Sequence, residues 1–430
     1  MSHTQFSLLG TRRFLAIFVT QFLGAMNDNL FRQALIMLIT YRIAEQMAMQ
    51  PAVLNNLAIG LFILPYFLFS ALAGQLADKF DKSKQIVWIK LWEVALMLIG
   101  ALAFQLSSLP LMIAVLSGLG LQSTFFGPIK YSILPELTNK NELLSANGLI
   151  EAGTFVAILL GLLVGGLLVL QPGGTDKMAM LMITLAIIGT ISGSLVPRTG
   201  AAAPDLKLNL NIFTATGQQV KAAWQHEIAR PAIIGISWIW LYGSIYLTQI
   251  PDVVKNRLGG DETVVTTIIA CFSVGIGVGS LMCARLLKGE ISAKLAKPAL
   301  YMLMATSLLL YLSLPGENGV TPDEIINIAG FLATPTNWIV LVLLIGVAVS
   351  TGMVIVPFYA ILQDRSKRSE RSRMIAANNI FNSGFMAGGS IIAAILIVLG
   401  LSSSEILLVC AFGNLAIVPV AAALMKRMMQ

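Results

Sequence analysis

The chain has 430 residues, of which 57% are hydrophobic and only 11% are charged, and its mean hydropathy is +0.82. Soluble domains carry about a quarter charged residues. This composition therefore excludes a soluble domain or a nucleic-acid-binding protein and indicates a membrane protein with several spans. The formal charge of +7 consequently needs an explanation at the membrane.

The apolar stretches are long enough to cross a bilayer. The first, Phe14 to Tyr41, exceeds the roughly 7–15-residue core of a signal peptide and predicts a retained helix. At roughly 20 residues per span, the sequence predicts twelve membrane-spanning helices. Their approximate ranges are 13–42, 52–77, 84–106, 109–133, 142–170, 178–197, 231–255, 263–287, 296–314, 336–362, 373–400 and 403–425.

The basic residues are distributed unequally between the two sets of loops. Of the 28 Lys and Arg, 22 lie at the termini or in the loops that follow even-numbered spans. The opposite set of loops holds only Arg42, Lys177, Lys255 and Arg257. By the positive-inside rule, this asymmetry predicts that both termini are cytoplasmic. It also accounts for the net charge without a polyanionic partner.

The longest predicted cytoplasmic loop divides the spans six and six. We therefore predict an N-terminal bundle over residues 1–197, a linker over 198–230 and a C-terminal bundle over 231–430. Within the linker, "NIFTATGQQVKAAWQH" has the pattern of a short amphipathic helix that lies along the membrane surface.

An internal repeat supports this division. "PIKYSILPEL" after the fourth span matches "PFYAILQD" after the tenth, so that Tyr131 and Glu136 correspond to Tyr359 and Asp364 at an offset of 228 residues. A few residues later, Asn147 corresponds to Asn378 at an offset of 231. Parallel halves of this kind are typical of the major facilitator fold, an all-α membrane fold of twelve helices in two six-helix bundles. In that fold the substrate binds near the midplane, between the halves.

The loop "GQLADKFDKSK" between spans two and three resembles the signature loop of the same superfamily. Gly74 permits close helix approach, Asp78 is suited to pair with the neighbouring bundle, and Lys82 lies on the cytoplasmic side. Asp81 stands where the signature usually has glycine. We predict that Gly74, Asp78 and Lys82 take part in gating, together with asparagines that begin spans five and eleven or follow soon after: Asn147, Asn378 and Asn382.

Several ionisable residues fall within predicted spans, where they should face the bundle interior or a wet cavity. They are Asp28, Arg32, Lys90, Glu93 and Glu151, with Lys130 near the cytoplasmic end of span four and Asp252 near an outer end. Asp28 and Arg32 are spaced i,i+4 and Lys90 and Glu93 are spaced i,i+3, so each pair can meet on one helix face. One interpretation is that both pairs only hold helices together. The other is that they line a polar cavity for a charged substrate group.

The distribution of these charges favours the second interpretation. All clearly mid-span charges lie in the first half, whereas the second half offers Asp252 and a few amides. A single-chain amphiphile suits such an asymmetric cavity. Its ammonium would meet the carboxylates, its phosphate would meet Lys130, and its tail would lie against the apolar second half.

The residues quoted above resemble the bacterial lysophospholipid transporters of the major facilitator superfamily. The matching stretches are "QFLGAMNDNL", "GQLADKFDKSK", "GPIKYSILPELTNKNELLSANGLIEAG" and "VPFYAILQDRSKRSERSRMIAANN". "WIKLWEVALML" and "IPDVVKNRLGGDETVVT" look more like the transporter module found fused to acyltransferase and acyl-carrier-protein synthetase domains. In "WIWLYGSIYLTQ" the arginine that stand-alone members carry in span seven is missing, so no role there is transferred.

The resemblance implies a lysophospholipid flippase of the bacterial inner membrane. It implies transfer of lysophosphatidylethanolamine and lysophosphatidylglycerol from the outer to the inner leaflet, where a cytoplasmic acyltransferase or acyl-carrier-protein synthetase restores the second chain. By matching motif, Asp28 and Lys130 become headgroup-contacting or gating residues. The full expected headgroup set is Asp28, Asn29, Arg32, Lys90, Glu93, Lys130, Tyr131 and Glu151.

Other functions are weighed against this one. No GxxxxGK[ST] motif occurs, and neither His3 nor His226 has an aspartate four residues later, so the sequence predicts neither ATP use nor an embedded acyltransferase, and no metal or cofactor. Two alternatives stay open. The first is a proton-coupled exporter of amphipathic drugs, and the second is a membrane anchor that positions an acyltransferase without moving lipid.

Overall fold

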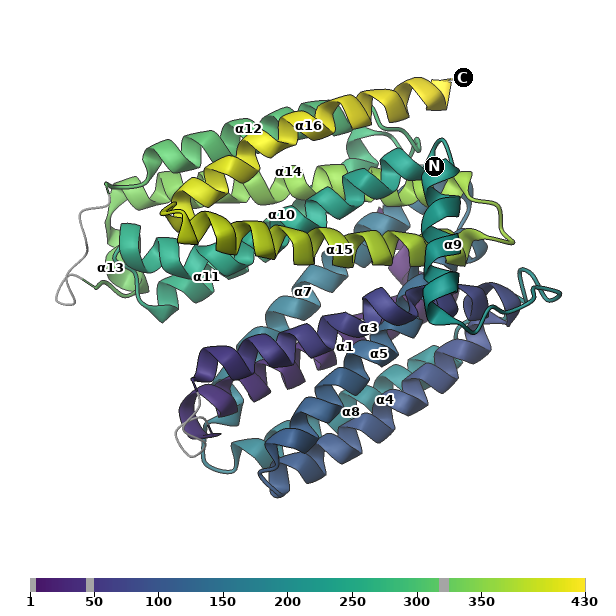
Figure 1. Cartoon of the computed structure of the whole chain (residues 1–430), viewed down its shortest axis with the longest axis horizontal. Helices are drawn as coiled ribbons and strands as arrows, with labels where there is room; N and C mark the ends of the chain where they lie inside the picture. Colours follow the sequence, from purple (N-terminus) through teal and green to yellow (C-terminus); the bar gives the residue numbers. More distant parts are fainter. Residues whose placement is uncertain (1–4, 44–49, 317–324, 430) are drawn as a thin grey trace. The chain divides into compact units, whose positions relative to one another are not determined.

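A computed structural model describes residues 5–43, 50–316 and 325–429 (Figure 1). Within these residues, twelve helices are long and apolar enough to cross a membrane, which confirms the twelve predicted spans. In chain order, these helices are α1 (Arg12–Leu38, continued by the π-helical turn η2, Ile39–Ile43), α3 (Pro51–Lys79), α4 (Lys82–Gln105), α5 (Leu109–Ser132), α7 (Leu143–Val169), α8 (Gly174–Ser194), α10 (Ala229–Arg257), α11 (Glu262–Leu286), α12 (Ala296–Ser313), α14 (Pro335–Arg365), α15 (Arg371–Val398) and α16 (Ser403–Met429).

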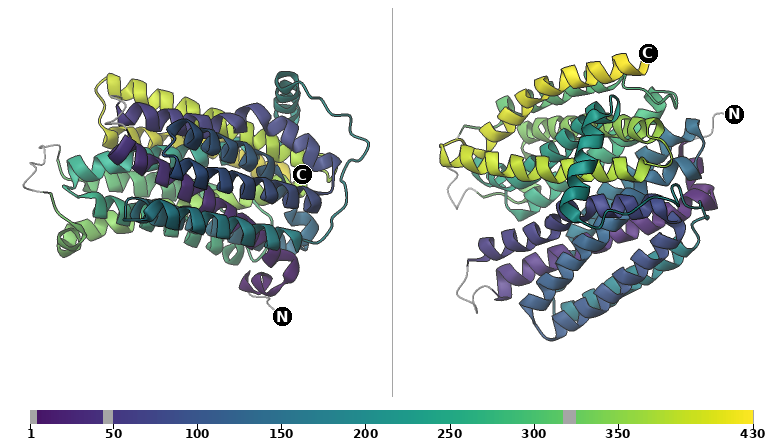
Figure 2. Two further views of the ribbon diagram at one scale, coloured as in Figure 1. Left: turned by 90° about the horizontal axis from the view of Figure 1, so that it is seen from below. Right: turned by 45° about the vertical axis from the view of Figure 1, so that its right-hand side comes forward.

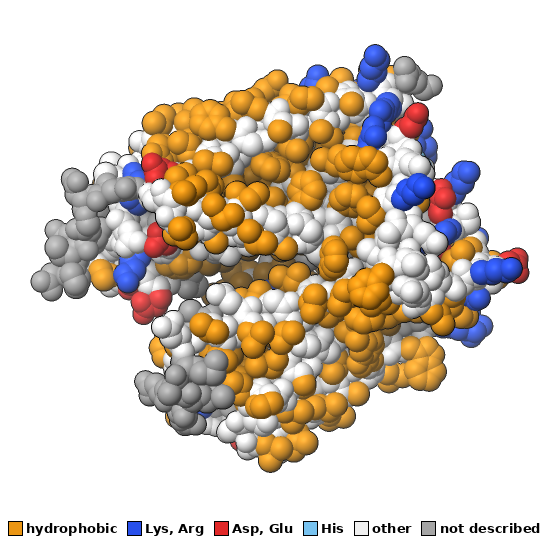
Figure 3. All heavy atoms as spheres, viewed as in Figure 1, with side chains coloured by type: hydrophobic (Ala, Val, Ile, Leu, Met, Phe, Trp, Pro, Cys, Tyr) orange, Lys and Arg blue, Asp and Glu red, His pale blue; other side chains and the backbone are white. Residues whose placement is uncertain are grey.

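Short elements precede the first span or connect later spans. They are η1 (Gln5–Gly10), α6 (Leu134–Leu137), η3 (Lys140–Glu142), α9 (Ile212–Gln225) and α13 (Ile328–Ala333). The amphipathic helix predicted in the linker is α9. Along the spans, apolar side chains cover the visible surface, whereas charged side chains gather at the helix ends (Figure 3). That distribution is what a bilayer requires, because hydrocarbon offers no partner for a charge.

The sharp turn between α3 and α4 does not need a glycine. Asp81 has φ −61° and is the N-cap of α4, where its side chain accepts hydrogen bonds from the Ser83 backbone N–H (2.9 Å) and the Ser83 hydroxyl (2.6 Å). Its other oxygen accepts from the Gly200 N–H at 3.1 Å. Aspartate at position 81, where the signature loop usually has glycine, is therefore compatible with the turn, since an aspartate is a good helix cap.

Contacts divide the chain into two compact units. Unit 1 comprises Met1–Ala146, Val156–Gln225 and Gln363–Ser383, and unit 2 comprises Asn147–Phe155, His226–Leu362 and Gly384–Gln430. The first half of α15 is thus counted with the helices of the first sequence half. The boundaries that we predict at residues 197 and 231 stay a prediction, because they follow the sequence repeat and not the contacts.

The core of unit 1 is built from apolar side chains of α1, α4, α5 and α8, including Leu30, Phe31 and Met97. Glycines allow α7 to approach α1 closely. A Cβ atom at Gly161 would lie 2.6 Å from the Met26 carbonyl oxygen, and one at Gly165 would lie 2.8 Å from that of Leu30. Small residues at these positions therefore let the two helices pack closely.

The interior of unit 2 is held by hydroxyl, amide and aromatic groups. On α10, the Tyr242 hydroxyl lies 3.0 Å from that of Tyr246, and both bond the Ser307 hydroxyl of α12. The Trp238 indole donates to Asn414 Oδ1 of α16 at 2.9 Å. All three cysteines are free thiols, and Cys283 and Cys410 are buried.

Candidate functional site

Asp28 lies on α1 and faces the interior of unit 1, with 8% of its surface exposed. Its Oδ2 accepts a hydrogen bond of 2.5 Å from the Ser123 hydroxyl of α5. Tyr66 of α3 lies beside both residues. Within the described parts of the chain, the second carboxylate oxygen, Oδ1, is buried and has no hydrogen-bond partner. A buried carboxylate oxygen without a partner is costly and marks a place where a ligand group can bind.

Arg32 does not form the expected pair with Asp28. Its guanidinium donates to Asn29 Oδ1 at 2.6 Å, and Asn29 in turn donates to the Ala25 carbonyl at 2.7 Å. Among the described residues no ion pair joins Arg32 to Asp28. The i,i+4 spacing permits contact but does not select it, because Asn29 offers an acceptor one turn away.

Two neighbouring residues of α5, Gln122 and Ser123, connect Asp28 to the second charged pair. Lys90 and Glu93 of α4 form an ion pair and each is only 1% exposed. Glu93 also accepts from Asn27 (3.1 Å) and from Gln122 (3.2 Å), and the Ser123 hydroxyl that reaches Asp28 lies 3.2 Å from Gln122 Oε1. Gln122 thus binds the Lys90–Glu93 pair of α4, and its neighbour Ser123 binds Asp28 of α1, so α5 joins the two sites.

Glycines of two neighbouring helices enclose Lys90. A Cβ atom at Gly24 of α1 would lie 3.3 Å from Lys90 Nζ, and one at Gly189 of α8 would lie 2.9 Å from the same atom. The ammonium thus fills space that only glycine leaves open. This burial favours a supporting part for Lys90 and Glu93, which hold the α4–α5–α1 network in place, over direct contact with a headgroup.

The remaining predicted headgroup residues lie in two places. Lys130 and Tyr131 are near the end of α5, with Lys130 Nζ 4.7 Å from the centre of the Tyr131 ring. Glu151 is fully buried on the segment of α7 that belongs to unit 2. Asp252, which is not in the headgroup set, is exposed on α10, where its carboxylate accepts a hydrogen bond from Asn256 at 2.7 Å.

The predicted gating residue Asp78 is fully buried at the end of α3 and caps α15. Its carboxylate accepts from the backbone N–H groups of Ser372 (3.0 Å) and Arg373 (3.3 Å) and pairs with the Arg373 side chain at 3.1 Å. A carboxylate is stabilised at a helix N-terminus by the exposed N–H groups and the helix dipole. Gly74 allows this approach, since a Cβ there would lie 2.6 Å from Ala376 Cβ.

A second charged group lies close to this contact. Lys82 is fully buried and pairs with Glu136 at 2.6 Å, and Glu136 also accepts from Arg368 at 3.4 Å. Asn378 and Asn382 follow on α15 and are buried, whereas Asn147 is buried in unit 2. Asp78 and Glu136 therefore both hold the segment that begins α15, and the roles of the three asparagines stay predictions.

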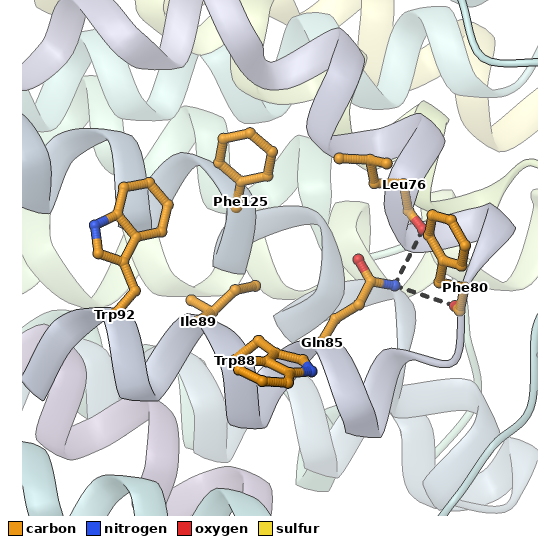
Figure 4. A pocket seen from close by; sticks show the side chains of 7 residues that line it. All are labelled: Leu76, Phe80, Gln85, Trp88, Ile89, Trp92 and Phe125. Carbon is orange, nitrogen blue, oxygen red and sulfur yellow. Dashed lines mark hydrogen bonds between the residues drawn. The ribbon is translucent and has the colours of Figure 1, made fainter.

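A pocket of about 300 Å³ opens between α3, α4 and α5, apart from this network (Figure 4). Its lining is almost wholly apolar. Gln85, which is polar, donates hydrogen bonds from its side-chain amide to the backbone carbonyls of Leu76 (3.0 Å) and Phe80 (3.1 Å). Trp88 at its rim is 72% exposed. This groove offers no charge for a headgroup, and its surface suits the acyl chains of the bilayer.

Sequence reasoning missed several partners of the predicted site residues. Asn27, Gln122 and Ser123 complete the buried network, and Ser372 and Arg373 complete the contact at Asp78. The pair Gln122–Ser123 carried a usable signal, because an amide inside an otherwise apolar span must find an internal partner. Among the described residues no cluster of three or more His, Cys, Asp or Glu could hold a metal ion.

Comparisons with known proteins identify the family of this chain. A family model described as the Major Facilitator Superfamily matches residues 2–322. The lysophospholipid transporter LplT of Escherichia fergusonii is 29% identical over 412 residues, covering 94% of this chain and 91% of the relative. The protein of the same name from Photorhabdus laumondii subsp. laumondii is 29% identical over 367 residues, covering 84% and 82%.

Among solved structures, the human organic anion transporter MFSD10 (TETRAN) is similar to this chain with a TM-score of 0.75, covering 95% of this chain and 99% of that one. The sequences are 13% identical. At that identity, the likeness concerns the fold alone.

Proposed function

The chain belongs to the major facilitator superfamily, and from this premise we propose that it is a lysophospholipid transporter of the bacterial inner membrane. It moves lysophosphatidylethanolamine and lysophosphatidylglycerol from the outer to the inner leaflet, where a cytoplasmic acyltransferase uses them. Relatives named lysophospholipid transporters that align with most of the chain support this proposal. The observation that carries it is the buried Asp28 carboxylate, whose Oδ1 has no hydrogen-bond partner among the described residues.

The geometry of α5 fits a zwitterionic headgroup. Ser123, which bonds Asp28, and Lys130 are seven residues apart and therefore lie on one face of α5, separated by roughly 10 Å along the axis. The long lysine side chain shortens that span. We assign the ammonium of lysophosphatidylethanolamine to Asp28 Oδ1, and the phosphate that both lysolipids carry to Lys130, because opposite charges then meet at each position.

The surrounding residues have supporting parts in this proposal. Lys90 and Glu93 fix Gln122 and Ser123, and these fix the Asp28 carboxylate. The tyrosine and serine hydroxyls inside unit 2 bond one another and so satisfy each other within the apolar interior of that unit. Lipid enters and leaves sideways between helices, because exposing the tail to water is unfavourable.

The test uses purified protein in liposomes with fluorescent lysophosphatidylethanolamine in the outer leaflet. Albumin extraction then reports the protected fraction over time, with and without a pH gradient. We expect rapid protection by the wild type. Asp28→Asn should slow it roughly tenfold or more, since a hydrogen bond to a charged group contributes about 1.5–3 kcal/mol. The matched control is Asp252→Asn, which neutralises an exposed carboxylate of α10 and should leave the rate unchanged.

Each alternative has its own signature in this assay. A proton-coupled drug exporter gives outward movement that requires the gradient, and a membrane anchor gives protection equal to that of empty liposomes in every condition. Equal rates for the wild type and Asp28→Asn would exclude Asp28 as the headgroup site while leaving lysolipid transport intact.

A further inference from the structure

The linker between the two halves binds along the side of α3. The Asp78 carbonyl accepts from the N–H groups of Ala202 and Ala203, at 3.0 and 2.7 Å. Lys79 Nζ donates to the Leu206 carbonyl at 2.9 Å. One turn further into α3, Gln75 Oε1 accepts from the Asn209 N–H at 2.7 Å. The linker therefore follows α3 from its charged end toward the middle of the span.

Helix α9 continues this path and reaches the level of Ala71. Its Asn211 N-cap accepts from the N–H groups of Phe213 and Thr214, both at 3.1 Å, which fixes where the helix begins. Ala215 of α9 is buried in a small apolar cluster with Ala71 of α3 and Ile380 of α15. Lys79 and Ala71 are separated by roughly 12 Å along α3. Helix α9 therefore contacts α3 about that far from its charged end, on the side of the middle of the span. Figures 1 and 2 show that it crosses the direction of α3.

The same helix contacts the first half of α15 at its other end. The rings of Trp224 and Phe381 stack with their centroids 6.1 Å apart. Helix α9 therefore spans the seam where α3 and α15 meet, beside the close approach of Gly74 to Ala376. All these residues belong to unit 1.

The outer side of α9 is apolar where a water-exposed helix would be polar. Phe213 and Trp224 of α9 are 74% and 50% exposed, and Leu210 just before the helix is 71% exposed. Phe213 and Trp224 are eleven residues apart, about three turns, and so share one face, which is opposite to the buried Ala215. Thr214, Gln218 and Lys221 form a separate exposed polar side. A helix with this pattern lies at the boundary between headgroups and acyl chains.

We propose that α9 is a bilayer-embedded latch on the α3–α15 seam, and that a lysolipid passes between the site at Asp28 and the bilayer on this side only when α9 leaves α15. This inference rests on the proposed function. Asp78 and α9 hold the same segment of α15, so both contacts must break when that segment departs from α3.

The experiment bridges α9 to α15. Cys271, Cys283 and Cys410 are replaced by alanine, and this cysteine-free parent is first shown to protect lysolipid in liposomes. The pair Trp224→Cys and Phe381→Cys is then joined by a short bifunctional thiol reagent that reduction can cleave. The control pair Gln218→Cys and Ala222→Cys takes the same reagent within α9, where residues at i and i+4 are neighbours.

We expect bridging of 224 to 381 to reduce lysolipid protection to the level of empty liposomes and reduction to restore it, with the control pair unaffected. Added lysophosphatidylethanolamine should also slow bridging of 224 to 381, whereas two-chain phosphatidylethanolamine should not. Unchanged transport by the bridged protein would overturn the latch. Absence of transport in the unbridged parent would instead overturn the proposed function, and the bridging rate would still report whether lysolipid releases α9.

Discussion

The Lys90–Glu93 pair shows how a charge can be kept inside a membrane bundle. Each residue is 1% exposed, and Glu93 accepts from Asn27 and Gln122 as well as from Lys90. Both charges are therefore balanced and hydrogen-bonded, the condition under which burial is tolerated. Asp28 is the different case, because its buried Oδ1 has no hydrogen-bond partner among the described residues.

Glu93→Gln should destabilise the protein by about 3–5 kcal/mol, because it leaves the Lys90 ammonium buried without a counter-charge. The double variant Lys90→Met with Glu93→Gln should recover part of this loss. Thermal unfolding in detergent measures both. The control Glu142→Gln removes the partly exposed pair with Arg13 and should cost at most about 1 kcal/mol. Equal effects of the Glu93 and Glu142 changes would contradict the role given to the buried pair.

At the scale of elements, the ends of α4 and α15 are fixed by carboxylates that bind backbone N–H groups. Asp81 caps α4 from within the same turn, and Asp78 reaches from α3 to the first N–H groups of α15. Burial tends to raise the pKa of Asp81, but the hydrogen bonds from Ser83 and Gly200 outweigh it, so its pKa lies below the ordinary value.

Asp81→Ala should lower stability by about 1 kcal/mol at neutral pH, because it removes the cap of α4. A lowered pKa means that the folded protein favours the ionised form, so this stabilisation is present above the unfolded-state pKa of about 3.9 and fades as the pH falls through the folded-state value. Thermal unfolding of the wild type and Asp81→Ala between pH 7 and acid should therefore converge below about pH 4. A constant difference down to the most acidic point would contradict this cap. Asp81→Ser should retain most of the stability, since serine is also a good cap.

At the scale of the whole molecule, the basic residues predict which side of the membrane each loop occupies. We expect both termini and α9 on the cytoplasmic side. Fusions test this, since alkaline phosphatase is active only outside the cytoplasm and green fluorescent protein folds inside it. Fused after Met429, the phosphatase should be inactive and the fluorescent protein bright. Fused after Gln171, between α7 and α8, the phosphatase should be active, and the reverse pattern would refute the orientation.

The sequence by itself determined the spans and the presence of polar groups inside them. Apolar runs of span length and the linker helix follow from local composition, because hydrocarbon admits only helices whose backbone groups are satisfied internally. The signature loop likewise indicated that Asp78 would pair with a distant helix, and the buried pair Lys90–Glu93 followed from its spacing.

Only the tertiary structure decided which polar groups meet across helices. Arg32 turns to Asn29 instead of Asp28, Ser123 of α5 binds Asp28, and Asp78 binds the start of a helix almost three hundred residues later. Spacing fixes which face of a helix a residue occupies, but the partner on another helix depends on how the two helices pack. The same holds for α9, whose amphipathic pattern predicted a membrane-surface helix, whereas its position on the α3–α15 seam depends on contacts with Ala71 and Ile380.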